Sequence, residues 1–279
     1  WGLAKKVIIA ESLRRFADTI FALPPGMLDT KTAWLGAVTY TLQIYFDFSG
    51  YSDMAIGLGL LFGFVLPENF KRPYSAISIT DFWRRWHISL SRWFRDYLYI
   101  PLGGNRRGAA RACLNMAVVF VLCGLWHGAN WTFVVWGGLH GLYLAVHKAL
   151  LRGRRIVGAE APRFGAMFLL RVLVTFNLVC LTWVFFRAAD FAAAIEIITR
   201  ILFWESRSPD MERLVIGERI GLLLGTMILL DWLQARRGDH AVMVRWHWLP
   251  RALGYAALVL LTLTIGNLTD EVPFIYFQF

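Results

Sequence analysis

Acidic and basic side chains are missing from a long stretch of this chain, because no Asp, Glu, Lys or Arg occurs between Ala112 and Val146. So long a run without formal charge is typical of segments that cross or enter a membrane. Cysteine is also scarce: Cys113, Cys123 and Cys180 lie in apolar runs and form no CxxC motif. This argues against a disulfide framework and against a metal site, and we expect three reduced cysteines in the core.

The period-two alternation of a membrane barrel is absent as well. What the chain has instead is apolar surface, since 57% of its 279 residues are hydrophobic, against about 45–50% in soluble domains. Several windows approach the ~20 apolar residues that a helix needs to cross the hydrocarbon core of a membrane. We therefore predict an all-α fold, a polytopic transmembrane helical bundle with interfacial and broken helices, as a single membrane domain over residues 1–279.

The formal net charge of +10 would suggest nucleic acid as the partner of a soluble protein. Here the basic residues cluster at the ends of apolar runs, for example at Lys5-Lys6, Arg84-Arg85 and Arg236-Arg237. Anionic lipid head groups and the positive-inside bias produce this pattern. We expect membrane lipids as partners and no nucleic acid, because the aromatic residues are not interleaved with a basic groove.

The apolar run 33–66 contains two carboxylates, Asp47 and Asp53. As one helix it would extend ~51 Å, which is too long for one untilted crossing, so we expect a break at Gly50 with both aspartates at the junction. The aspartates would bind substrate hydroxyls or orient a histidine. Alternatively, because buried charges need partners, they would form ion pairs with one of three arginines: Arg84, Arg85 or Arg171.

The charge-free run is expected to break near Gly128, with Asn130 capping the next helix. Ala112 to His127 would extend ~23 Å, which places His127 at membrane depth. An imidazole takes and returns a proton near neutral pH, so His127 is a candidate general base. The alternative is a structural histidine bonded across helices, and His140, on the next helix, is a further candidate for either role.

Residues 81–97 are predicted to form one amphipathic helix at the membrane interface, with Ser78 as its cap. Tryptophans lie on one face and arginines on the other. His87, at the edge of the aromatic face, would be a second proton carrier, a substrate ligand or an interfacial residue. Further helices are expected over residues 2–21, 168–186, 190–203, 221–233 and 252–268.

Several motifs together resemble the membrane-bound O-acyltransferase family. They are Phe46 to Gly57, Pro67 to Phe70, Phe82 to Ser91, Arg95 to Asn105 and Gly124 to Trp131. The closing run Pro273 to Phe279 is similar to the bacterial alginate O-acetyltransferase branch. The resemblance extends over essentially the whole chain, and it implies that further N-terminal helices precede Trp1, so that this chain is the C-terminal part of the fold.

The resemblance implies a multi-pass enzyme of the bacterial inner membrane. An acyl group would pass from a cytoplasmic thioester such as acetyl-CoA to a hydroxyl of an exported polysaccharide such as alginate, with no bound cofactor. A periplasmic acetyltransferase would be a partner in the last step. The family's catalytic histidine corresponds to His127, and the second histidine of this branch corresponds to His87, which would bind or polarise the thioester.

The expected substrate-binding residues surround these two histidines in the motifs: Asp47, Asp53, Arg84, Arg85, Trp126 and Asn130. Arg84 and Arg85 would hold donor phosphates or, alternatively, face lipid. Two other functions remain open. One is D-alanyl transfer to teichoic acid, which the same family contains. The other is proton-coupled transport, since broken helices with intramembrane Asp and His also fit a carrier.

Overall fold

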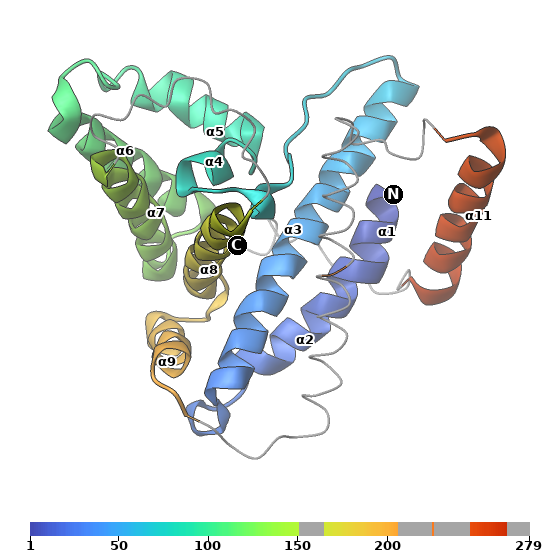
Figure 1. Cartoon of the computed structure of the whole chain (residues 1–279), viewed down its shortest axis with the longest axis horizontal. Helices are drawn as coiled ribbons and strands as arrows, with labels where there is room; N and C mark the ends of the chain where they lie inside the picture. The colour runs from blue at the N-terminus through green and yellow to red at the C-terminus, as the bar shows by residue number, and fades with distance from the viewer. Residues whose placement is uncertain (151–164, 206–224, 226–245, 267–279) are drawn as a thin grey trace. The chain divides into compact units, whose positions relative to one another are not determined.

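The computed structural model describes residues 1–150, 165–205, 225 and 246–266, and this part of the chain is helical, with no strand (Figure 1). It divides into two compact units. The first contains residues 1–66 and the described residues from 199 onward, and the second contains residues 67–198. The all-α prediction is confirmed for the described residues, whereas the single domain over residues 1–279 stays a prediction.

In the first unit, an N-terminal helical segment lies antiparallel to the long helix α3 (Thr30–Leu61) (Figure 1). The segment consists of α1 (Gly2–Ala4), the π-helical η1 (Lys5–Ala10) and α2 (Glu11–Phe21). A 3-10 turn, η2 (Pro25–Met27), then reverses the chain. The helix expected over residues 2–21 is confirmed.

Helix α3 runs through Gly50 without interruption, so the predicted break at this glycine is wrong. A Cβ atom on Gly50 would lie 2.8 Å from the carbonyl oxygen of Gly2, and one on Gly2 would lie 2.6 Å from the carbonyl oxygen of Gly50. The two glycines therefore let the backbones of α1 and α3 touch, as small residues do where membrane helices pack closely. A side chain at Gly50 would prevent this contact, and the helix continues through the glycine.

The start of α3 is tied to the chain that follows α9 (Phe191–Leu202). The backbone N–H of Thr30 donates to the carbonyl of Glu205 at 3.1 Å, and its hydroxyl donates to the carbonyl of Arg200 at 2.8 Å. Asp29 caps α3 by accepting from the backbone N–H of Thr32 at 2.8 Å. Helix α11 (Trp248–Ile265) packs beside α1.

The second unit is organised around a helical hairpin, α6 (Gly108–His127) and α7 (Trp131–Leu150). A Cβ atom on Gly124 would lie 2.2 Å from a carbonyl oxygen of α7, and one on Gly137 would lie 2.1 Å from a carbonyl oxygen of α6. Neither glycine can be replaced without separating the two backbones. The predicted break near Gly128 is confirmed, because α6 ends one residue before it.

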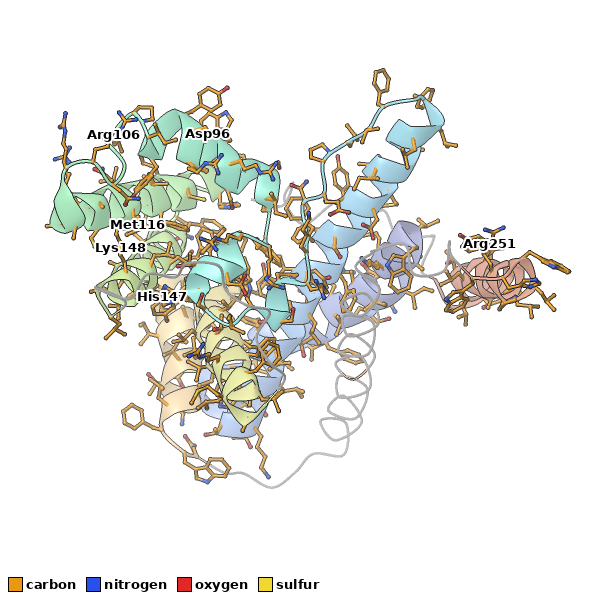
Figure 2. All side chains as sticks on the ribbon, turned by 45° about the horizontal axis from the view of Figure 1, so that its top comes forward. Asp96, Arg106, Met116, His147, Lys148 and Arg251 are labelled. Carbon is orange, nitrogen blue, oxygen red and sulfur yellow. The ribbon has the colours of Figure 1, made fainter. Side chains whose placement is uncertain are left out.

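Helix α8 (Ala166–Arg187) packs against α7, and a chain of short elements completes the unit. Figure 2 labels His147 and Lys148 at the end of α7, where Nδ1 of His147 lies 3.0 Å from the hydroxyl of Thr80. The short elements are η3 (Pro73–Ser75), α4 (Ile79–Trp83), α5 (Ile88–Phe94) and the π-helical η4 (Arg95–Tyr99).

The single helix predicted over residues 81–97 is therefore wrong, since α4 and α5 are separated by a turn. Ser78 does cap α4, by accepting from the backbone N–H of Asp81 at 3.2 Å. The interruption has a physical cause in the preceding segment. The N–H of Lys71 donates to the carbonyl of Arg85 at 2.9 Å, and the N–H of Ile88 donates to the carbonyl of Asn69 at 3.1 Å. These bonds take backbone groups that a continuous helix would use itself.

Among the described residues, α6 and α8 are long and apolar enough to cross a membrane. The helices expected over residues 168–186 and 190–203 are confirmed as α8 and α9, and that over residues 252–268 corresponds to α11. The helix expected over residues 221–233 and the closing run 273–279 lie outside the described residues. The number of membrane crossings stays a prediction.

Candidate active site

His127 is the last residue of α6, and its side chain is enclosed by aromatic rings of three helices. Its ring centroid lies 4.9 Å from that of Trp126, 5.2 Å from that of Trp136 and 5.0 Å from that of Phe186, each with its plane steeply inclined to the imidazole. Only 8% of the residue is exposed. An imidazole in such a shell is held in place by packing and is shielded from bulk solvent.

Helix α6 begins at Gly108 rather than at Ala112, which changes the depth estimate for His127. Its 20 residues extend ~30 Å, about the thickness of the hydrocarbon core. His127 therefore stands at one end of a span-length helix, and protein rings provide its shielding. Its depth in the membrane stays a prediction.

The glycines around His127 allow α7 to start beside it. A Cβ atom on Gly128 would lie 2.5 Å from the ring of Phe133, so a side chain there would displace that ring. Asn130 then caps α7, because its Oδ1 accepts from the backbone N–H of Thr132 at 3.1 Å. The predicted capping role of Asn130 is confirmed. The run from Trp126 to Trp131 thus combines a helix end, a close approach and a new cap in six residues.

His87 occupies the turn between α4 and α5 and has a left-handed backbone, with φ 42° and ψ 57°. Such a conformation is uncommon for a residue with a Cβ atom and usually marks a functional or tightly held position. The residue is half-buried. Burial lowers the pKa of His87 from its ordinary value of 6.5 to about 4, because it disfavours the charged imidazolium. The ring is therefore neutral at physiological pH.

The two predicted catalytic histidines belong to the same compact unit and lie close enough to interact electrostatically. A row of indoles runs between the elements that carry them. The ring centroids of Trp86 and Trp183 are 5.1 Å apart, and those of Trp183 and Trp136 are 5.7 Å apart. Trp136 in turn contacts His127.

Two of these indoles have buried hydrogen-bond donors without a partner among the described residues. Trp136 and Trp183 are each 1% exposed, and neither Nε1 atom has a hydrogen-bond partner among the described residues. A buried donor without a partner costs free energy, which a bound ligand oxygen would offset. The site therefore offers imidazole nitrogens and indole N–H groups within one aromatic shell.

His140 has both ring nitrogens occupied and serves the core. It is 0% exposed, and its Nδ1 accepts from the indole N–H of Trp83 at 3.2 Å. The hydroxyl of Thr182 donates to the carbonyl of Val179 at 2.7 Å, so at 2.9 Å from Nε2 it accepts the proton of the imidazole. These partners fix a neutral tautomer with no nitrogen left over for chemistry.

The structure places Asp47 and Asp53 in the first unit, in ion pairs with lysines of η1. Lys5 Nζ lies 2.8 Å from Oδ2 of Asp53, and Lys6 pairs with Asp47. The expectation of arginine partners is wrong, although the expectation of an internal ion pair is right in kind. Lys5 and Lys6 had been assigned to lipid head groups, and their burial against α3 corrects that assignment.

The two arginines before His87, Arg84 and Arg85, differ in exposure and in their hydrogen bonds. Arg84 is exposed, whereas the guanidinium of Arg85 donates to Asp81 at 2.9 Å and to the hydroxyl of Ser75 at 3.4 Å. Arg171, on α8, is exposed. Trp126 is 59% exposed and covers one side of His127. Substrate contacts by Arg84, Arg85, Trp126 and Asn130 stay predictions.

Sequence reasoning gave no role to the residues that surround the two histidines in space. Trp136 and Trp183 come from α7 and α8, and nothing in the local pattern distinguishes them from other core tryptophans. Asn69 and Ser89 contact the His87 turn, but 20 residues separate them in sequence. In the sequence, Asn69 and Ser89 stand out only because they lie in two of the family-like motifs, Pro67 to Phe70 and Phe82 to Ser91.

Comparisons with known proteins identify the family of this chain. The sequence profile of the membrane-bound O-acyltransferase family matches residues 4–195, which include both candidate catalytic histidines. The chain is 47% identical over 230 residues to the probable alginate O-acetylase AlgI of Pseudomonas aeruginosa, a match that covers 82% of this chain and 42% of that protein. It is 48% identical over 197 residues to the peptidoglycan O-acetyltransferase of Helicobacter pylori, covering 71% of this chain and 36% of that protein.

A more distant relative is the teichoic acid D-alanyltransferase of Streptococcus thermophilus, which is 31% identical over 166 residues, or 53% of this chain and 39% of that protein. The chain spans less than half the length of each of these curated relatives. The family profile nevertheless matches most of the present sequence, and the apolar helices fit its membrane location. This chain is a membrane protein that belongs to the membrane-bound O-acyltransferase family.

Proposed function

We propose that the protein containing this chain is an O-acyltransferase that moves acetyl groups from a cytoplasmic thioester, such as acetyl-CoA, toward hydroxyls of an exported polysaccharide. The observation that carries the proposal is His127, a buried imidazole in an aromatic shell with a second neutral histidine nearby. The names of the relatives support acetyl transfer, because they describe O-acetylation of alginate and of peptidoglycan. A multi-pass protein of the bacterial inner membrane suits a donor and an acceptor on opposite sides.

His127 acts as the general base in this mechanism. It takes the proton of the acceptor hydroxyl as the oxygen attacks the thioester carbonyl, and a C–O bond forms. When the tetrahedral intermediate collapses, the C–S bond breaks and the imidazolium returns the proton to the thiolate. Proton transfer of this kind typically contributes ~10²–10⁴-fold to the rate.

The surroundings of His127 support the remaining requirements. The indole N–H groups of Trp136 and Trp183 are donors suited to an oxygen that gains negative charge. His87 is the second histidine of the site and binds the donor. Arg84, which is exposed, is available for donor phosphates, whereas Arg85 first has to leave Asp81 and Ser75.

The acceptor is the least constrained part of the proposal. Alginate is the favoured polysaccharide because the AlgI relatives match over 69–82% of this chain at 46–54% identity. A periplasmic acetyltransferase would receive the acyl group before the polymer does. D-alanyl transfer to teichoic acid is the second candidate, and the 31% identity to a D-alanyltransferase is the observation in its favour.

The test uses the full-length protein that contains this chain, purified and placed in liposomes. Acetyl-CoA labelled in the acetyl group is added on one side, and thiol release and label transfer to an oligosaccharide acceptor are measured. We expect both, in equal amounts. Label on the acceptor only when D-alanyl thioester is supplied would favour the D-alanyl alternative.

A carrier would give a different result in the same liposomes. It would move solute or protons without consuming the thioester, so the absence of thiol release together with solute flux would contradict the proposal. In cells, mass spectrometry of the exopolysaccharide from a deletion strain, with and without the full-length gene, identifies the acylated sugar. An unchanged acetyl content would also contradict it.

A further inference from the structure

We propose that Asn69 and Ser89 are positioning residues for His87, and that they fix the tautomer in which Nδ1 carries the hydrogen and Nε2 is unprotonated. The inference rests on the proposed function and specifies how the second histidine takes part in it. All three residues belong to the second unit. The side-chain oxygen of Asn69 accepts hydrogen bonds from the backbone N–H and the hydroxyl of Ser89.

Asn69 holds the backbone on the C-terminal side of His87. Its carbonyl oxygen accepts from the N–H of Ile88 at 3.1 Å, and its side-chain Oδ1 accepts from the N–H of Ser89, also at 3.1 Å. On the other side, the N–H of Lys71 donates to the carbonyl of Arg85. The left-handed turn at His87 is therefore fixed from both flanks by one extended segment.

The same amide also fixes the hydroxyl of Ser89. Ser89 Oγ lies 2.6 Å from Asn69 Oδ1, and because Oδ1 already accepts from the N–H of Ser89, its identity as the oxygen of the amide is settled. An oxygen only accepts, so the single proton of the hydroxyl is given to Asn69. The lone pairs of Ser89 Oγ then remain for another donor.

That donor is the ring of His87, whose Nδ1 lies 3.5 Å from Ser89 Oγ. Since the hydroxyl proton is already used, this contact is favourable only when Nδ1 carries a hydrogen. In a neutral imidazole the other nitrogen, Nε2, is then unprotonated. An orienting partner on one ring nitrogen commonly determines the chemistry of the other in this way.

This tautomer determines what His87 can do. A ring with a bare Nε2 accepts a hydrogen bond or a proton there and cannot donate one. It therefore acts on a hydroxyl, thiol or amide hydrogen of a substrate, and polarisation of the thioester carbonyl falls to other donors. His127, on α6, is the titratable group that interacts with His87 from a neighbouring element.

The first experiment compares matched variants of the full-length enzyme in liposomes at pH 8. We expect Ser89→Ala and Asn69→Ala to lower kcat by about 10–100-fold with little change in KM, the range seen when an outer partner of a functional histidine is removed. Ser89→Thr and Asn69→Asp keep the hydroxyl and the acceptor oxygen, and should restore activity. Ser91→Ala is the control, since its hydroxyl bonds a backbone carbonyl, that of Trp86 in the turn before α5, rather than a side chain. Parental kcat in Ser89→Ala, or no rescue by threonine, would overturn the proposal.

The second experiment does not depend on acyl transfer. Diethyl pyrocarbonate modifies neutral imidazoles, and mass spectrometry of the peptide containing His87 gives the pH midpoint of its reaction. A carboxylate in place of the Asn69 amide favours the imidazolium, so Asn69→Asp should raise the midpoint above that of the parent, whereas the Ser91→Ala midpoint should not move. An unmoved midpoint in Asn69→Asp contradicts the contact. If the parent transfers no acetyl, the proposed function fails while this measurement still decides the positioning of His87.

Discussion

Two carboxylates of the first unit and two histidines of the second are held in different ways. In the first, Asp47 and Asp53 are ionic and each is matched to a lysine of the neighbouring helix. In the second, His127 lies among aromatic rings, His87 lies in a turn, and the indole N–H groups of Trp136 and Trp183 have no hydrogen-bond partner among the described residues. The two carboxylates are charged and paired, whereas the histidines and indoles are neutral groups that can still form a bond to a substrate.

The difference indicates where chemistry is possible. A carboxylate matched to a lysine gives up its partner if it takes a proton, so such a pair is suited to holding helices together. A neutral imidazole can take a proton from a substrate without breaking an ion pair. Asp47 and Asp53 belong to the first kind of group, and His127 and His87 belong to the second.

The largest expected effect comes from removing the imidazole of His127. We expect His127→Ala to lower acetyl transfer by ~10²–10⁴-fold, the usual contribution of a general base. The thermal midpoint in detergent should change little. His147→Ala is the control, because that residue is bonded to Thr80 at the far end of α7. Normal transfer by His127→Ala would remove this residue from the mechanism.

The ion pairs of the first unit should respond in stability. Lys6→Ala or Asp47→Ala leaves one charge unmatched against α3, which should cost about 3–5 kcal/mol of unfolding free energy. The double variant Lys6→Met with Asp47→Leu removes both charges and should recover most of this loss. The measurement is denaturant unfolding of the full-length protein in detergent, with transfer activity per folded molecule as a second readout. If that activity falls more than tenfold in the double variant, Asp47 has a role beyond the ion pair.

Local sequence predicted several features of the fold because their causes are local. The break at Gly128 and the cap at Asn130 need only residues 124–132. The same reasoning failed at Gly50, because a glycine that permits a close contact with Gly2 has the same appearance as one that permits a bend. Only the three-dimensional partner distinguishes the two.

The parts of the site that could not be predicted depend on contacts distant in sequence. The partners of Asp47 and Asp53 come from residues 41 and 48 positions away, and no helical period connects them. The turn at His87 exists because Asn69 and Lys71 supply hydrogen bonds from outside the helix. The motifs identified His127 and His87, but not the groups that hold them.

A smaller effect is expected at His140, the histidine of the second unit that resembles the ion pairs in being fully matched. Thr182→Val removes the acceptor of its Nε2–H and should cost ~1–3 kcal/mol of unfolding free energy, the usual penalty for an unpaired buried group. Thr182→Ser keeps the hydroxyl and should lose less. The measurement is the unfolding free energy of both variants in detergent. A loss in Thr182→Ser as large as that in Thr182→Val would contradict this ranking, because serine keeps the hydroxyl and lacks only the methyl group.

The smallest effect concerns pH, and it distinguishes a His87 with a lowered pKa from one with an ordinary pKa. With its pKa lowered to about 4, the ring keeps one charge state from pH 5 to 8, so the ratio of kcat/KM between the parent and His87→Gln should stay constant over that range. An ordinary pKa of 6.5 would make the ratio fall below pH 6.5, by up to about tenfold per pH unit.

The pH dependence of stability also distinguishes a neutral His87 from a charged one. Between pH 4 and 6.5 the unfolded chain binds a proton at His87 that the folded protein does not bind, so the contribution of the neutral ring is complete above pH 6.5 and is lost as the pH falls toward 4. The gap in thermal midpoint between the parent and His87→Gln should therefore narrow when the pH is lowered from 7 to 5. A gap that widens would mean that His87 is charged in the folded protein, and that it belongs with the matched ions of the first unit rather than with His127.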